Sequence, residues 1–427
     1  MLKKYKLGEV AEFEISNIDK KTKEGETIVN LCNFTDVYYN WAVTESMSDA
    51  FMIASASDSQ IKKFRLKKGQ VAITKDSETR DDIGIPCYMA DDFNKTVLGY
   101  HCALITPKPL MLDGRYLNAF LNSKMAKKYF ANNAAGSGMR YSLPVDTIKN
   151  ISLYLPDIKS QKAIGELFSN IDRKIALNRE INRNLEAMAR QLYDYWFVQF
   201  DFPDENGRPY KSSGGKMVWN ERLKREIPEG WYCGTLLDIA EYTNGLACQK
   251  YRPTDENKLP VIKIKEMHDG ISPDTEWVKA DIPENVKVYD GDVLFSWSAS
   301  LEVMLWANGN GGLNQHIFKV TSKNGYPRSF CFYQLKHYIG VFKQMAEARK
   351  TTMGHITQDH LKQSAITLPS NIDIANKLEE KLCPILDAIV KNNQEISILT
   401  KQRDELLPLL MNGQVNCDLY FIDAIRI

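Results

Sequence analysis

Residues Lys159 to Phe200 read KSQKAIGELFSNIDRKIALNREINRNLEAMARQLYDYWFVQF. A second stretch, Asn371 to Met411, reads NIDIANKLEEKLCPILDAIVKNNQEISILTKQRDELLPLLM. In both stretches apolar residues recur at steps of three and four, which is the spacing of a coiled-coil seam. We therefore predict two long amphipathic helices. Either helix alone would also suit the core of a globular domain, but two of them, each following a similar segment, favour a coiled coil.

The predicted seam contains one polar residue near the middle of each helix. In the first helix the seam residues are Ile164, Phe168, Ile171, Ile175, Asn178, Leu185 and Leu192. In the second helix they are Leu378, Leu382, Ile385, Ile389, Asn392, Ile396, Leu399 and Leu406. A lone polar residue at a seam position usually costs stability and can fix the register of the two helices. We assign that position to Asn178 and Asn392.

The two halves of the chain match each other in order. Leu7–Phe13 (LGEVAEF) resembles Leu236–Tyr242 (LLDIAEY), and Leu155-Pro156 resembles Leu368-Pro369. Matches between these points keep the same order, and the drift in spacing is what loop insertions would produce. The sequence therefore predicts a tandem duplication in which a globular unit and a long helix occur twice.

The expected fold class is α+β. Each globular unit is rich in strand patterns and carries one further helix, roughly 116–132 in the first and 329–347 in the second. The predicted divisions are a first unit, a spacer helix, a connector, a second unit, a second spacer helix and a tail, at 1–156, 157–200, 201–230, 231–369, 370–412 and 413–427. We expect the long helices, each about 60 Å at 1.5 Å per residue, to pack antiparallel in a pseudo-two-fold arrangement. Such a shape suits a target in two parts, such as two DNA half-sites.

The composition excludes several classes of protein. The 427 residues exceed the usual size of one domain, and the net charge of +1 gives no global signal for nucleic acid. Basic residues can still gather on one face. The eight cysteines include no C-x-x-C pair, so neither zinc-ligand nor redox spacing is present. With neither a signal-peptide pattern nor an apolar run of membrane-spanning length, we expect a cytoplasmic protein.

The sequence carries no known catalytic motif. It contains no P-loop, no G-x-G-x-x-G, no G-x-S-x-G and no H-E-x-x-H. The glycine-rich segment 309–312 follows no convincing strand–helix unit and is interpreted as a turn. We therefore expect no catalytic residue, no metal site and no cofactor in this chain.

Polar, basic and aromatic loop residues are the remaining candidates for function. Lys and Arg can contact phosphates, Arg can read guanine, and Gln can read adenine. The predicted DNA-binding residues of the first unit are Lys75, Arg80, Tyr100, His101, Arg140 and Tyr141. Those of the second unit are Trp297, Gln315, His316, Arg349, Lys350 and His355. Any one of them also suits an ordinary polar surface loop. The scaffold positions match between the units while these loops differ, which is expected if each unit reads a different sequence.

The chain resembles the specificity subunits of type I restriction–modification systems over nearly its whole length. The resemblance is carried by the tandem architecture, by Leu155-Pro156 followed by Gln161, and by the connector segments 196–203 (WFVQFDFP) and 210–215 (YKSSGG). Two more segments match, 227–231 (IPEGW) and 399–413 (LTKQRDELLPLLMNG). The second Leu-Pro segment lacks the glutamine of the first, so that repeat departs from the pattern.

The resemblance implies a non-catalytic DNA-recognition subunit. Each globular unit would be a target recognition domain that reads one half of a bipartite, asymmetric DNA sequence, and the helices would set the spacer between the halves. Two modification (methyltransferase) subunits and the restriction (translocase and nuclease) subunits would assemble on it. S-adenosylmethionine, ATP and magnesium would then be bound by those partner subunits. Two other interpretations remain open. The chain could be an enzyme that modifies or cleaves DNA by itself, or a coiled-coil scaffold that binds only protein.

Overall fold

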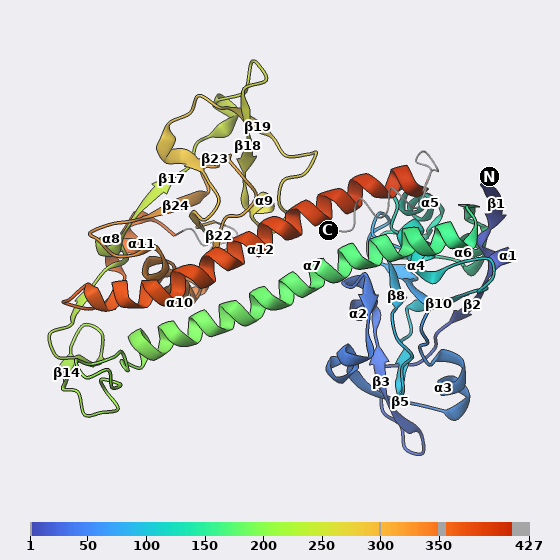
Figure 1. Ribbon diagram of the computed structural model, residues 1–427, viewed down its shortest axis with the longest axis horizontal. Helices are drawn as coiled ribbons and strands as arrows, with labels where there is room; N and C mark the ends of the chain where they lie inside the picture. The colour runs from blue at the N-terminus through green and yellow to red at the C-terminus, as the bar shows by residue number, and fades with distance from the viewer. Residues whose placement is uncertain (1, 299, 349–355, 412–427) are drawn as a thin grey trace. The chain divides into compact units, whose positions relative to one another are not determined.

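The computed structural model describes residues 2–298, 300–348 and 356–411. The chain divides into two compact units (Figure 1). Among the described residues, unit 1 contains 2–175 and 399–411, and unit 2 contains those between 176 and 398. Each long helix thus contributes one part to each unit, whereas the sequence-based divisions fall where the helices start. The reason is that the side chains of each helix segment pack against the globular core of the unit in which that segment lies.

Unit 1 is built on one five-stranded and two three-stranded sheets (Figure 1). The five-stranded order β2-β10-β6-β8-β4 is formed by Ala11–Ile15, Cys102–Pro107, Val71–Thr74, Pro86–Met89 and Ala42–Val43. The order β5-β3-β9 is formed by Met52–Ala56, Thr27–Cys32 and Thr96–Leu98. The order β11-β12-β7 is formed by Ala135–Ser137, Arg140–Ser142 and Asp76–Ser77. A separate pair joins β1 (Lys3–Lys6) to β13 (Ser152–Leu155).

Unit 2 repeats this plan with fewer strands. The order β17-β24-β21-β22 is formed by Ala240–Asn244, Ile317–Ser322, Val293–Ser296 and Glu302–Leu305. The order β19-β18-β23-β20 is formed by Trp277–Lys279, Lys258–Ile262, Gly311–Leu313 and Lys287–Val288. Two pairs complete the unit: β16 (Tyr232–Gly234) with β25 (Ile366–Leu368), and the connector hairpin of β14 (Met217–Asn220) with β15 (Arg225–Pro228).

Strand register confirms the duplication. In unit 1 Ala103 of β10 lies opposite Ile15 of β2 and Ile73 of β6. In unit 2 Phe318 of β24 lies opposite Asn244 of β17 and Phe295 of β21. In the sequence repeat Ile15 matches Asn244, Ile73 matches Phe295 and Ala103 matches Phe318. The central three strands of both units therefore keep one register, and the fold is α+β as the sequence predicts.

The short helices also correspond between the units, with one break. The units begin with α1 (Leu7–Val10) and α8 (Leu236–Ile239), and they end with α6 (Val145–Asn150) and α11 (Gln358–Gln363). Helix α2 (Phe34–Tyr38), which follows β3, corresponds to α9 (Ile264–Asp269), which follows β18, and unit 1 adds α3 (Asp58–Phe64). The predicted helix 329–347 is continuous as α10 (Arg328–Ala348), but the one predicted at 116–132 is two helices, α4 (Gly114–Leu121) and α5 (Lys124–Asn133). The break occurs because the Ser123 side chain accepts a hydrogen bond from the Ala126 amide and begins a new helix.

The glycine-rich segment 309–312 is a turn only in its first part. Gly309 has a φ of +81°, which suits a turn, but Gly311 and Gly312 belong to strand β23. A Cβ on Gly311 would lie 2.6 Å from Cγ1 of Ile262, and one on Gly312 would lie 2.5 Å from Cγ1 of Val278. The glycines therefore let β23 lie close to neighbouring side chains, a reason that the sequence pattern does not reveal.

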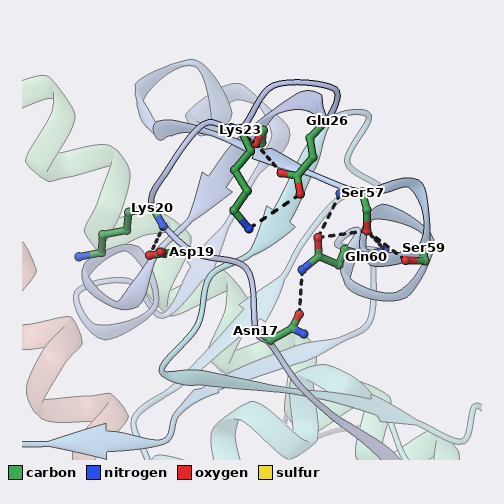
Figure 2. A network of polar contacts seen from close by, with 9 residues as sticks. Asn17, Asp19, Lys20, Lys23, Glu26, Ser57, Ser59 and Gln60 are labelled. Carbon is green, nitrogen blue, oxygen red and sulfur yellow. Dashed lines mark hydrogen bonds and ion pairs between the residues drawn. The ribbon is translucent and has the colours of Figure 1, made fainter.

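Polar contacts hold the loop before β3 against α3 at the periphery of unit 1 (Figure 2). Gln60 Oε1 accepts a hydrogen bond from the Ser57 amide at 3.0 Å, and Gln60 Nε2 donates one to Asn17 Oδ1 at 3.1 Å. Nearby, Lys23 Nζ lies 3.9 Å from a Glu26 carboxylate oxygen. The Ser57–Gln60 contact belongs to the capping box of α3, and the Gln60–Asn17 contact ties the loop to it. The network therefore stabilises the N-terminus of α3.

The long helices are α7 (Ile158–Tyr193), followed by a π-helical turn at Asp194–Val198, and α12 (Asp373–Met411). Most of the predicted seam side chains are buried, and the half-buried ones are Leu185, Leu192, Ile385, Asn392, Ile396, Leu399 and Leu406. In α7, three buried positions that the prediction omitted continue the same steps of three and four, namely Gln161, Asn182 and Ala189.

Inside unit 2 the two helices run antiparallel and meet in a polar layer. Asn182 Nδ2 donates a hydrogen bond to Asn393 Oδ1 at 2.8 Å, and Asn182 Oδ1 accepts one from Asn392 Nδ2 at 2.8 Å. One turn away, Asn178 Nδ2 donates to Glu395 Oε2 at 2.8 Å. The prediction named Asn178 and Asn392 as the polar seam residues. Both take part in these contacts, but the prediction omitted Asn182, which pairs with Asn392, whereas Asn178 lies one helical turn before Asn182 and reaches Glu395.

The start of α7 is anchored in unit 1 by Gln161 and Gly165. Gln161 is 1% exposed, donates to the Met111 and Pro156 carbonyls at 3.0 Å each, and accepts from the Asp113 amide at 3.1 Å. Gly165 lies against the first turn of α4. These contacts give a structural reason for the glutamine and the glycine at these positions.

We expect Gly165→Ala to lower the thermal unfolding temperature. An alanine Cβ there would lie 2.7 Å from Cβ of Arg115 and 2.7 Å from the Tyr116 amide nitrogen. Such overpacking costs about 1–3 kcal/mol, more than the roughly 1 kcal/mol that alanine gains over glycine in a helix. Gly340→Ala is the matched control, because Gly340 lies in α10 with nothing within 4 Å of its added Cβ. Circular dichroism melts would contradict this packing account if the two variants unfolded at the same temperature.

Candidate nucleic-acid interface

In unit 1 the predicted DNA-binding residues gather around the carboxylate of Asp76. Lys75 follows β6, Asp76 opens β7, and His101 directly precedes β10. The Lys75 ammonium lies 3.3 Å from Asp76 Oδ1, and His101 Nδ1 lies 2.6 Å from Asp76 Oδ2. One carboxylate therefore holds a lysine and a histidine side by side.

Asp76 remains ionised at neutral pH. Partial burial alone would raise the pKa of its carboxyl, but hydrogen bonds from His101 and Ser142 and the positive charge of Lys75 outweigh burial and hold that pKa below the usual 3.8. An ionised carboxylate only accepts hydrogen bonds. The ring nitrogen of His101 that faces it must therefore be the donor.

The backbone places His101 in an uncommon conformation. Its φ is +71°, in the left-handed region that a non-glycine residue seldom adopts. Its carbonyl accepts a hydrogen bond from the Lys75 amide at 2.7 Å, and the ring of Tyr100 lies 3.8 Å from its own ring between centroids. Strained residues of this kind cluster at functional sites, so the observation supports a role for this loop.

A small sheet brings the other three candidates of unit 1 into the same cluster. Strand β12 pairs with β7, so that Tyr141 lies opposite Ser77 and Ser142 lies opposite Asp76. The guanidinium of Arg80 lies over the Tyr141 ring, 5.2 Å from its centroid. Arg80 and Arg140 are exposed. We call the set the Asp76 cluster; its members are Lys75, Asp76, Arg80, Tyr100, His101, Arg140, Tyr141 and Ser142.

The corresponding site of unit 2 is aromatic where that of unit 1 is charged. Trp297 Nε1 donates to Asn244 Oδ1 at 2.9 Å, and the Trp297 ring lies 5.5 Å from the His316 ring between centroids. Gln315 Nε2 lies 3.3 Å from His316 Nε2. Within the described part of unit 2, His316 Nδ1 is buried without a hydrogen-bond partner. The remaining predicted residues of this unit, Arg349, Lys350 and His355, lie outside the described residues.

The two sites share one backbone frame. In unit 1 the Lys75 amide donates to the His101 carbonyl at 2.7 Å, and the Leu143 amide donates to the Lys75 carbonyl at 2.8 Å. In unit 2 the Trp297 amide donates to the His316 carbonyl at 3.3 Å, and the Ile356 amide donates to the Trp297 carbonyl at 3.1 Å. The frame thus presents lysine and aspartate in unit 1 at the positions where unit 2 has Trp297 and Ser298.

Comparison with known proteins identifies the family. The family model described as the type I restriction modification DNA specificity domain matches residues 2–187 and again residues 228–403. The chain belongs to this family. The two matches correspond to the two halves of the duplication, so the protein carries two DNA specificity domains in tandem.

Relatives of this specificity subunit agree with the assignment. The type I restriction enzyme MjaIX specificity subunit of Methanocaldococcus jannaschii is 24% identical over 363 residues, which cover 82% of this chain and 78% of that protein. The HindI specificity subunit of Haemophilus influenzae is 24% identical over 410 residues, covering 82% of this chain and 87% of that protein. The crystal structure of a type I restriction-modification S subunit from M. genitalium has a TM-score of 0.58 at 14% identity, covers 96% of both chains and shows the same fold.

The family assignment confirms the recognition drawn from the sequence. The chain is a DNA-specificity component of a type I restriction–modification system and works as one subunit of a larger assembly that includes DNA. Its role in that assembly is recognition, and no catalytic role belongs to it. Within the described residues no group of three or more His, Cys, Asp or Glu side chains could hold a metal ion, and no helix is long and apolar enough to cross a membrane.

Sequence reasoning missed three side chains of the specificity domains. Asp76 was seen only as part of a polar loop, although its carboxylate organises the Asp76 cluster. Ser142 and Asn244 were not singled out, yet the first hydrogen-bonds Asp76 and the second holds Trp297. The sequence carries no signal for these two residues, because only the pairing of strands brings Asn244 and Ser142 to their partners.

Proposed function

We propose that this specificity subunit reads a bipartite, asymmetric DNA target, with one specificity domain for each half. The observation that carries the proposal is the shared backbone frame with different side chains. The frame holds a lysine–aspartate–histidine group in unit 1 and a tryptophan–histidine group in unit 2. Two domains with one scaffold and different polar surfaces suit two different base sequences.

The long helices set the number of base pairs between the two halves in this proposal. A helix has a fixed rise of about 1.5 Å per residue, so its length measures distance. The polar layer of Asn182, Asn392 and Asn393 supports a fixed register, since a side-chain hydrogen bond of this kind is lost when one helix slides along the other.

The partners belong to the proposal as well. Two modification subunits and the restriction subunits assemble on this chain, which leaves catalysis to them. S-adenosylmethionine, ATP and magnesium are bound by those partners. A cytoplasmic location, where DNA and partner subunits meet, goes with this assembly.

Binding to duplex DNA at several salt concentrations separates this function from that of a scaffold for protein alone. Neutralising phosphates releases counterions, so a subunit that contacts DNA through several cations loses affinity steeply as salt rises. The complex with the modification subunit is titrated with random duplex DNA, and the modification subunit alone is the control. We expect the complex to bind more tightly than the control and with a steeper salt dependence. Equal affinities and slopes would favour the protein-only scaffold.

A further inference from the structure

The Asp76 cluster contains an ordered pair of hydrogen-bonding groups. Asp76 accepts from Lys75 through Oδ1 and from His101 through Oδ2, at 3.3 Å and 2.6 Å. The Lys75 ammonium carries three N–H groups, and its side-chain contacts in the described structure are with Asp76 and Ser142 Oγ, at 3.4 Å for the latter. A third N–H donor remains for a ligand.

The tautomer of neutral His101 follows from this contact. Asp76 is ionised and only accepts, so the His101 proton lies on Nδ1. In the neutral ring the other nitrogen, Nε2, then has no proton and is a hydrogen-bond acceptor. The side chain of His101 is 24% exposed and that of Lys75 is 21% exposed, so neither is sealed in the core. Unit 1 thus holds a donor, Lys75, beside an acceptor, His101.

We propose that Asp76 is the positioning residue for base recognition in the first half-site, and that it sets the Lys75–His101 pair to read adenine. In the major groove adenine presents an acceptor, N7, next to a donor, the N6 amino group. Lys75 donates to N7 and His101 Nε2 accepts from N6. Guanine presents two acceptors, N7 and O6, and leaves His101 Nε2 facing an oxygen. The inference rests on the proposed function and adds the base and the group that selects it.

Unit 2 supplies an internal comparison. His316 occupies the position of His101, but Ser298 stands where unit 1 has Asp76, and Trp297 stands where it has Lys75. His316 Nδ1 has no hydrogen-bond partner among the described residues, and its φ is not in the left-handed region. Among the residues that the structure describes, no carboxylate therefore fixes the His316 ring, and the donor–acceptor pair is found in unit 1 and not in unit 2.

The first test reads the tautomer directly. The full chain is labelled with nitrogen-15 at its six histidines, and the ring signals of His101 are assigned from their loss in His101→Gln. At a pH where the ring is neutral, we expect a protonated Nδ1 and an unprotonated Nε2. In Asp76→Asn the amide can donate as well as accept, so the ring should shift towards the Nε2–H tautomer. A wild-type ring protonated on Nε2 would overturn the proposal.

The second test reads base preference in the complex with the modification subunits. DNA duplexes carry each base in turn at every position of both half-sites. We expect Asp76→Asn to reduce the preference for adenine at one position of the first half-site by about tenfold or more, the effect of losing one base contact. Ser298→Ala, the matched change in unit 2, should leave that position unaffected. If Asp76→Asn leaves the base preference in the first half-site unchanged while the second half-site is still recognised, this inference is wrong and the proposed function stands.

A third variant separates positioning from stability. Glutamine can pair with adenine N6 and N7 by itself and has no tautomer to fix. We therefore expect His101→Gln to keep much of the adenine preference, His101→Leu to lose it, and Asp76→Asn to have little further effect when added to His101→Gln. A purely structural role of Asp76 predicts the same loss in both backgrounds and would contradict the proposal. Absence of base preference in both half-sites of the wild-type complex would instead overturn the proposed function, and this inference with it.

Discussion

We expect Lys75→Ala and Arg80→Ala each to weaken recognition of one half of the DNA target and to leave the other half unaffected. Lys75 lies in the Asp76 cluster, and the exposed Arg80 lies over Tyr141 at its edge. Loss of a direct base contact costs about 1–3 kcal/mol, or roughly ten- to a hundredfold in affinity. The measurement is competition by DNA duplexes that carry base changes in only one half-site.

Gln315→Ala in unit 2 is the reciprocal control. Gln315 is half-buried beside His316, so the variant should weaken recognition of the other half-site only. A loss spread equally over both half-sites for any of these variants would indicate general electrostatic binding. If both Lys75→Ala and Arg80→Ala recognised the DNA target normally, the Asp76 cluster would not be part of the DNA interface.

Lengthening both long helices by one heptad should lengthen the spacer of the DNA target. Duplicating 171–177 in α7 and 396–402 in α12 inserts seven residues into each helix, next to the points where the compact units divide. Seven residues add about 10 Å of helix at 1.5 Å per residue, close to three base pairs at 3.4 Å each. The heptad keeps the seam in phase. The preferred spacer is read from methylated sites, and both half-site sequences should remain as they were.

The same insertion in α7 alone is the control for this experiment. It shifts the residues of one helix relative to those of the other, so the polar layer of Asn182, Asn392 and Asn393 cannot form together with the rest of the seam. We expect that variant to be unstable or inactive. A double insertion that folds and methylates DNA with the original spacer would show that the helices do not measure the distance.

The architecture could be predicted because it depends on repeated patterns. The seam at steps of three and four appears in both long helices, and equivalent strands of the two units keep one order and one register. The position of the polar layer was harder to predict. Asn178 and Asn182 both fit the seam spacing, and only the relative position of the antiparallel helices decides that Asn182 meets Asn392.

The candidate site was predicted as a set of residues, and the contacts among them were not. Lys75, Tyr100, His101 and Tyr141 come from three separate segments, and the sequence does not show that a short sheet joins them. The role of Asp76 depends on its distance from His101 and on the left-handed backbone of that histidine. Neither quantity follows from a periodic pattern or a motif.

Mapping methylated adenines tests the central claim most directly. The chain is co-expressed with its modification subunit, and modified bases are located across a genome by single-molecule sequencing. The account predicts one asymmetric motif in two parts separated by a fixed number of unspecified base pairs. A stable complex that methylates a single continuous motif, or no DNA at all, would contradict the account.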